Sequence, residues 1–146
     1  MKMKSIIIAL DESTYSQVIA RQGFELATVF KSTVTILLIR NNEAVINASL
    51  ANISIEENDN SEEKLMIEIQ ELAKIFDTIE FGMTTLEGDP MEEIIRFVTD
   101  NTADLLIVGT HGRTGLDHWI TGSVAEHVIR HATIPVLVIP YNHQAH

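Results

Sequence analysis

The chain has 146 residues, of which 45% are hydrophobic and 21% are charged, a balance typical of a globular protein with a substantial core. Its formal net charge is −11, from 10 Lys and Arg residues against 21 Asp and Glu residues. Nucleic-acid binding depends on Lys and Arg side chains that neutralise phosphates, so this charge argues against nucleic acid as a partner. An anionic ligand would have to be bound mainly by neutral backbone donors or by local cations, which gather in the last third of the chain at His111, Arg113, His118, His127, Arg130 and His131.

The sequence predicts a cytoplasmic protein. It contains no cysteine, which fits a reducing compartment. The amino-terminal residues run into a short apolar segment, Ile6 to Leu10, which is too short for the core of a signal peptide. No apolar run approaches the length of a membrane span, so we expect no membrane partner.

The first half of the chain alternates strand patterns with helical ones. Continuous β-branched runs predict strands at 4–10 and 33–39. Between them, a helical stripe predicts a helix whose inner face carries Tyr15, Val18, Ile19, Leu26, Val29 and Phe30. Residues 41–60 are rich in Asn, Ser and Glu and read as a surface connection, and residues 62–76 form an amphipathic helical pattern.

The second half continues the alternation. Ile79, Phe81 and Met83 alternate with polar residues, which predicts a half-exposed strand near a sheet edge. Asp89 and Pro90 suit the N-cap and first position of a helix, and Ser123 has Glu126 three residues later, the spacing of a capping box. The helix after Ser123 is expected to face inward through Val124, Val128 and Ile129. Apolar runs predict further strands at 103–108 and 135–139. Strands alternating with helices predict an α/β, single-domain, Rossmann-like fold over 1–146, with an open, mainly parallel five-stranded sheet, helices on both faces and a tail at 141–146.

A glycine pattern follows the strand predicted at 103–108. Gly109 and Gly112 are followed, after nine residues, by Gly122 and Ser123, which gives the spacing G-x2-G-x9-G-S. Glycines let backbone N–H groups approach an anion closely, and the first turn of a helix presents unpaired N–H groups to it. The pattern therefore predicts a phosphate-binding loop, with turn and cap glycines of no ligand significance as the alternative.

Several segments together resemble the universal stress protein family over nearly the whole chain. They are the segment Ile6 to Asp11 with Ser13, the segment Glu87 to Pro90, the segment Asp104 to Gly109, and the run from His111 through Gly122 and Ser123 to Pro140. The spacing G-x2-G-x9-G-S/T marks the ATP-binding branch of that family, and this chain matches every fixed position.

The resemblance implies a homodimer that pairs through the last strand, and ATP as the ligand, with Mg²⁺ expected only if the triphosphate recruits it. Carried over by position, the backbone at Gly109, Gly112, Gly122, Ser123 and Val124 would hold the phosphates, and Asp11 would accept hydrogen bonds from ribose hydroxyls. Ala9, Leu10, Ile39 and Val108 would enclose the adenine. Two positions depart from the family pattern: Glu12 replaces a common Gly, and Arg40 has no acidic residue directly after it.

Single residues have other interpretations. Asp11 could be the N-cap of the first helix, and Ser123 could be a cap alone. Arg113 could pair with phosphate or be a solvated loop residue. His127 and His131, four residues apart, could share a metal ion, but no carboxylate completes an H-E-x-x-H pattern, so a solvent-facing pair is the favoured interpretation.

Three functions remain open. The first is an ATP-binding stress-response regulator or sensor that binds nucleotide without fast turnover and acts on a protein partner that the sequence does not identify. The chain has neither a Walker lysine nor a G-x-S-x-G elbow, and no clamp for efficient phosphoryl transfer, so we expect no enzyme activity beyond weak hydrolysis. The alternatives are a slow ATPase and a nucleotide-free dimeric interaction module.

Overall fold

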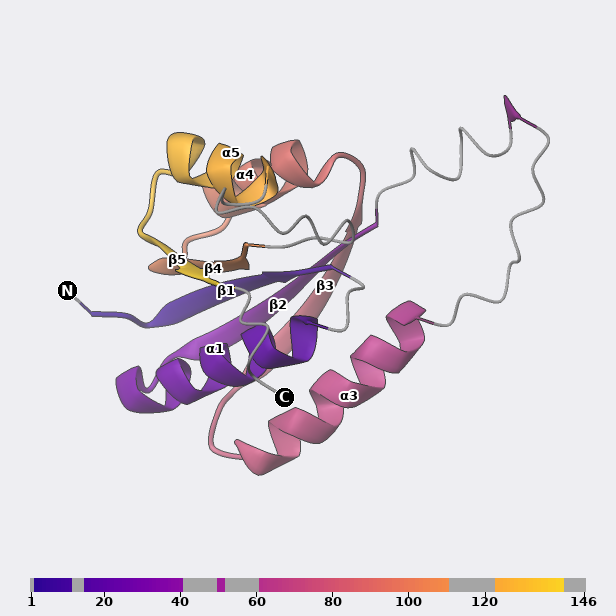
Figure 1. Cartoon of the computed structure of the whole chain (residues 1–146). Coiled ribbons are helices and arrows are strands. Elements are labelled where there is room, and N and C mark those ends of the chain that lie inside the picture. Colours follow the sequence, from indigo (N-terminus) through magenta and orange to yellow (C-terminus); the bar gives the residue numbers. More distant parts are fainter. Residues whose placement is uncertain (1, 12–14, 41–49, 52–60, 111–122, 141–146) are drawn as a thin grey trace.

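A computed structural model describes residues 2–11, 15–40, 50–51, 61–110 and 123–140, and these residues build a five-stranded sheet with helices on both faces (Figure 1). Every strand pairing is parallel, and the strand order is β3-β2-β1-β4-β5, which confirms the predicted fold class. The elements are β1 (Ser5–Leu10), α1 (Ser16–Phe30), β2 (Thr33–Arg40), α3 (Ser61–Ile75), β3 (Phe81–Glu87), α4 (Pro90–Asp100), β4 (Leu105–Gly109), α5 (Ser123–His131) and β5 (Val136–Ile139).

The sheet separates two apolar layers. Helices α1 and α3 cover one face and α4 and α5 cover the other, as Figure 1 shows. Because successive strand residues point to opposite faces, Ile6 and Ile8 pack in the first layer and Ile7 and Ala9 in the second. Burial on both sides explains why β1 reads as a continuous apolar run, whereas the edge strand β3 alternates as predicted.

Helix α1 follows the predicted stripe only in part: Ile19 is buried and Tyr15 and Leu26 are half-buried, but small residues complete the inner face. Its buried face consists of Ser16, Ile19, Ala20, Gly23, Phe24 and Ala27. Val29, expected to face inward, is 75% exposed, and Val18 and Phe30 are also exposed. A Cβ atom built on Gly23 would lie 2.3 Å from Cδ1 of Ile8, so the absence of a side chain there allows the helix to approach β1 closely. The helix therefore turns toward the sheet the face whose small residues allow close packing, and several of its larger apolar side chains point away from the sheet.

The other helices largely follow the sequence predictions. Leu65, Ile69, Leu72 and Ala73 of α3 are buried. The ring of Phe24 stacks on that of Phe76 at a centroid distance of 5.7 Å and meets that of Phe81 edge to face at 5.8 Å. Asp89 caps α4, with its carboxylate accepting a hydrogen bond from the N–H of Met91 at 3.0 Å.

Helix α5 begins at Ser123 as predicted, but Ile129, expected to face inward, is 52% exposed. Glu126 pairs with Arg130 at 2.9 Å. Val128, also expected to face inward, is fully buried, and so is its neighbour on the inner face, Ala125.

Candidate functional site

The carboxyl ends of the strands bring the described site residues to one edge of the sheet. Asp11 follows β1, and Gly109 ends β4, the strand paired with β1 on one side. Strands β2 and β3 lie on the opposite side of β1 from β4, so the direction in which strands are added to the sheet reverses between β1 and β4. Ligands of open α/β sheets bind at this kind of switch point, and Asp11 and Gly109 flank it.

Asp11 is held by the first residue of α1. The hydroxyl of Ser16 lies 2.6 Å from the main-chain oxygen of Asp11 and 3.2 Å from its Oδ1. The N-cap of α1 is Tyr15, which makes no side-chain cap bond, so the structure does not place Asp11 at the N-cap. Asp11 directly follows β1, four residues before that cap. Its half-buried side chain therefore lies at the carboxyl edge of the sheet.

The four residues expected to enclose an adenine are all buried, but they do not form one wall. Ala9, Ile39 and Val108 belong to the apolar layer beneath α4 and α5. Leu10 belongs to the layer beneath α1 and α3, because adjacent residues of a strand point to opposite faces. The structure therefore brings three of the four together and places Leu10 on the other side of the sheet.

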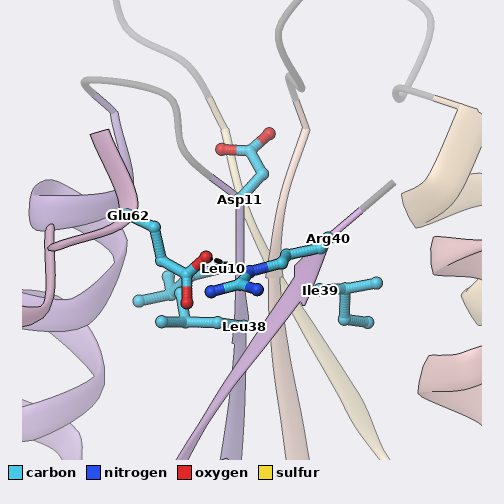
Figure 2. A pocket seen from close by; sticks show the side chains of 6 residues that line it. All are labelled: Leu10, Asp11, Leu38, Ile39, Arg40 and Glu62. Atoms are coloured by element: carbon cyan, nitrogen blue, oxygen red, sulfur yellow. Dashed lines mark hydrogen bonds and ion pairs between the residues drawn. The ribbon is translucent and has the colours of Figure 1, made fainter. Parts of the chain in front are cut away.

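A small hollow lies where β1 and β2 end, facing the start of α3 (Figure 2). It is lined by Leu10, Asp11, Leu38, Ile39, Arg40 and Glu62, and measures about 170 Å³ with open solvent included. Because this space includes open solvent and encloses no room for a water molecule, the hollow formed by these described residues is a surface depression and not a formed nucleotide pocket. The sequence reasoning did not assign Leu38, Arg40 and Glu62 to the site, since only the packing of α3 brings Glu62 to this edge.

An ion pair forms the outer wall of that hollow. Arg40 Nε contacts Oε2 of Glu62, and its Nη1 lies 3.6 Å from Oε1 of Glu87 at the end of β3. Figure 2 shows the guanidinium of Arg40 turned toward Glu62 above Leu10 and Leu38. Gly88 then turns the chain into α4 with φ of 140°, which side chains other than glycine rarely adopt, and its N–H donates to the oxygen of Arg40 at 3.0 Å. Arg40 thus links the ends of β2 and β3 to the first turn of α3.

Part of the glycine pattern lies within the described residues. Gly109 ends β4, and the N–H of Thr110 donates to the oxygen of Ile139 at 3.1 Å. A Cβ on Gly109 would lie 2.3 Å from Cδ1 of Ile19, so packing alone gives a reason for glycine here. Val124 is half-buried in the first turn of α5. Gly112, Arg113, Gly122 and the side chain of Ser123 lie outside the described residues.

Helix α5 points its amino terminus toward the same edge. Because β4 and β5 are parallel, the helix between them must run back across the sheet, so it begins near the carboxyl ends of the strands. The unpaired N–H groups of its first turn, together with the helix dipole, favour an anion there. In the sequence, the end of β4 therefore precedes the undescribed part of the glycine pattern and the start of α5 follows it, and both lie at the same edge of the sheet.

The histidines of α5 contact each other. The rings of His127 and His131 stack with centroids 4.2 Å apart, and Nδ1 of His131 lies 2.8 Å from the oxygen of His127. Within the described ranges, no group of three or more His, Asp or Glu side chains is placed to hold a metal ion. A search of the same residues finds no helix long and apolar enough to cross a bilayer.

The sequence model of the universal stress protein family matches residues 2–140. Universal stress protein MJ0531 of Methanocaldococcus jannaschii is 52% identical over 54 residues, which are 37% of this chain and 32% of that protein. Universal stress protein MJ0577 of the same organism is 36% identical over 91 residues, 62% of this chain and 52% of that protein. This chain therefore matches about a third of the length of one relative and about half of the other.

Solved structures share the fold over almost the whole chain. The structure of MJ0577 superimposes with a TM-score of 0.77 at 24% identity, covering 99% of this chain and 100% of that one. A universal stress protein in complex with cAMP gives 0.69 at 18% identity, covering 96% and 98%. The universal stress protein from Archaeoglobus fulgidus in complex with dAMP gives 0.66 at 18% identity, covering 95% and 99%.

Proposed function

Because the chain belongs to the universal stress protein family, we propose that it is an ATP-binding, cytoplasmic regulator or sensor of the stress response, built as one nucleotide-binding domain. The observation that carries this proposal is the placement of Asp11 and Gly109 on either side of the switch point between β1 and β4. The start of α5 at the same edge adds the N–H groups that an anion needs. The relatives in complex with cAMP and dAMP support an adenine nucleotide as the ligand class.

In this proposal the glycine loop holds the phosphates through backbone N–H groups of Gly109, Gly112, Gly122, Ser123 and Val124, with Arg113 and any recruited Mg²⁺ as the counter-charge. Asp11 accepts hydrogen bonds from the ribose hydroxyls. Ala9, Ile39 and Val108 support the base from the α4 and α5 side of the sheet, and Leu10 from the hollow on the other side.

The proposal includes a homodimer formed through β5. This strand is an edge of the sheet, and its Leu137 is 40% exposed while Ile129 of α5 is 52% exposed. A strand at the edge of the described sheet with exposed apolar side chains is suited to pairing with a second copy. ATP would act by binding one conformation, or one partner-bound state, more tightly than another.

A nucleotide-free interaction module is the second candidate. Two observations favour it: packing against Ile19 already accounts for Gly109, and the hollow at the sheet edge is small. The two candidates differ in whether nucleotide stabilises the protein. A ligand at a hundred times its dissociation constant stabilises the folded state by about 2.7 kcal/mol, whereas a module that binds no nucleotide should show no change in thermal midpoint.

The proposal is tested first by denaturing freshly purified protein and identifying what it releases by chromatography and mass spectrometry. We expect an adenine nucleotide in near-stoichiometric amount. A protein that releases nothing and also fails to bind added ATP would favour the interaction module. Steady release of ADP from added ATP, lost in Asp11→Ala or Ser123→Ala, would instead indicate the slow ATPase.

A further inference from the structure

Two polar side chains are fully or almost fully buried in the part of the chain that the structure describes. Ser16 is 0% exposed and Ser32 is 4% exposed. Burying a hydroxyl without a hydrogen bond costs free energy, so each must be satisfied by a partner inside the protein. Ser32 Oγ contacts the main-chain oxygen of Met3, at the amino-terminal edge of the sheet and far from the candidate site. Ser16 lies at the opposite edge, beneath Asp11.

The hydroxyl of Ser16 contacts Asp11 at two atoms. Its Oγ lies 2.6 Å from the main-chain oxygen and 3.2 Å from the carboxylate Oδ1 of that residue. A serine hydroxyl carries one proton, so it donates mainly to the nearer oxygen and shares or alternates with the carboxylate. The hydroxyl thereby ties both the backbone and the side chain of Asp11 to the first residue of α1.

Helix α1 is itself fixed against β1, which makes Ser16 a rigid support. Ile19, Ala20, Gly23 and Phe24 pack the helix into the apolar layer, and the Gly23 backbone approaches Ile8 closely. A hydrogen bond from a fully buried group on a rigid element restricts the rotamers of its partner. Asp11 is therefore held in place at the sheet edge.

We propose that Ser16 is a positioning residue for the recognition of ribose. This inference rests on the proposed function, in which the Asp11 carboxylate accepts hydrogen bonds from the ribose hydroxyls. Ser16 holds that carboxylate in its binding orientation, so the ligand does not have to order it. The gain in affinity from a carboxylate ordered in advance is about two- to tenfold, and it applies only to ligands that carry the hydroxyls.

The test compares dissociation constants for ATP and 2′,3′-dideoxy-ATP, measured by titration calorimetry on the full chain. The wild type should bind ATP more tightly than the dideoxy analogue. Ser16→Ala should lower this preference by about two- to tenfold while leaving the affinity for 2′,3′-dideoxy-ATP nearly unchanged. Ser32→Ala removes the other, almost fully buried hydroxyl at the opposite edge of the sheet, and it should keep the wild-type preference.

A double-mutant comparison keeps the test decisive. In an Asp11→Ala background, Ser16→Ala should have no further effect on the preference, because the residue it positions is gone.

Four results would overturn the inference. Ser16→Ala with the wild-type preference would show that the hydroxyl does not position the carboxylate. An equal loss for both ligands would indicate a general structural role. A wild type that binds ATP without preferring it over the dideoxy analogue would remove the ribose role of Asp11 while leaving ATP binding in place, whereas a wild type that binds neither would refute the proposed function itself and the inference with it.

Discussion

Gly23→Ala should destabilise the protein even though alanine favours a helix more than glycine does. The new Cβ would lie 2.3 Å from Cδ1 and 3.0 Å from Cγ1 of Ile8, and Cδ1 of Ile107 is only 3.5 Å away. Ile8 is fully buried, so its side chain cannot move aside into solvent. Overpacking of a core costs about 1–3 kcal/mol, whereas the helix gains about 1 kcal/mol from replacing Gly by Ala. The 2.3 Å approach is a severe overlap, so we take the upper part of that range, about 2–3 kcal/mol, and expect a net loss of about 1–2 kcal/mol in the free energy of unfolding.

A double-mutant cycle isolates the contact that causes this loss. Ile8→Val removes Cδ1, the atom nearest the new Cβ, and should cost about 0.5–1.5 kcal/mol by itself. In that background Gly23→Ala should be nearly neutral, because the worst overlap is gone. Urea unfolding followed by circular dichroism gives the four free energies. Gly82→Ala is the control: its Cβ meets nothing within 4 Å on the exposed edge strand, so no loss is expected.

Either of two results would contradict this expectation. Gly23→Ala could be as stable as wild type, which would show that α1 shifts from the sheet at little cost. It could also lose the same free energy in the Ile8→Val background as in the wild-type background, which would place the strain elsewhere. In either case, close packing of α1 on β1 would not be what holds the first residue of α1, Ser16, in place next to Asp11.

Three further predictions concern other contacts. Asp104→Ala removes the Oδ2 that accepts from the N–H groups of Lys4 at 2.8 Å and Ser5 at 3.0 Å, and it should lower the free energy of unfolding by about 1.5–3 kcal/mol in urea titrations, with Asp77→Ala as the exposed control. Glu62→Gln breaks its ion pair with the half-exposed Arg40, so it should cost at most about 1 kcal/mol and less at high salt; a loss independent of salt would contradict this. Leu137→Lys should convert the proposed dimer to monomer in sedimentation velocity, and an unchanged dimer would exclude pairing through β5.

The sheet could be predicted from the sequence because buried parallel strands leave a strong apolar signal. The continuous run in β1 and the alternation in β3 follow directly from burial on two faces or one. The face of α1 could not be predicted, because Gly23 and Ala27 mark it by their small size, which a search for apolar stripes overlooks. Ile129 was also expected to face inward from its helical spacing, but it is exposed on α5, the helix that precedes the edge strand β5.

The candidate site could be predicted only where strand ends determine it. Asp11 and Gly109 lie at the expected edge because they end adjacent strands. Ala9 and Leu10 point to opposite faces of the sheet, as the two-residue period of a strand requires, although the family resemblance assigned both to the adenine site. The Arg40–Glu62 ion pair and the support of Asp11 by Ser16 depend on how helices pack on the sheet, which local sequence does not encode. Gly112, Arg113 and Gly122 lie outside the described residues, so their roles stay predictions.

The central claim is that the glycine loop binds ATP, and calorimetric titration of ATP into wild type and Gly122→Val tests it most directly. A bulky side chain at Gly122 should keep backbone N–H groups from approaching the phosphates, while the two apolar layers of the sheet are left intact. We predict a saturable, one-site isotherm for the wild type and none for Gly122→Val, with equal unfolding free energies for the two ligand-free proteins. Equal ATP affinities of wild type and the variant would contradict the claim.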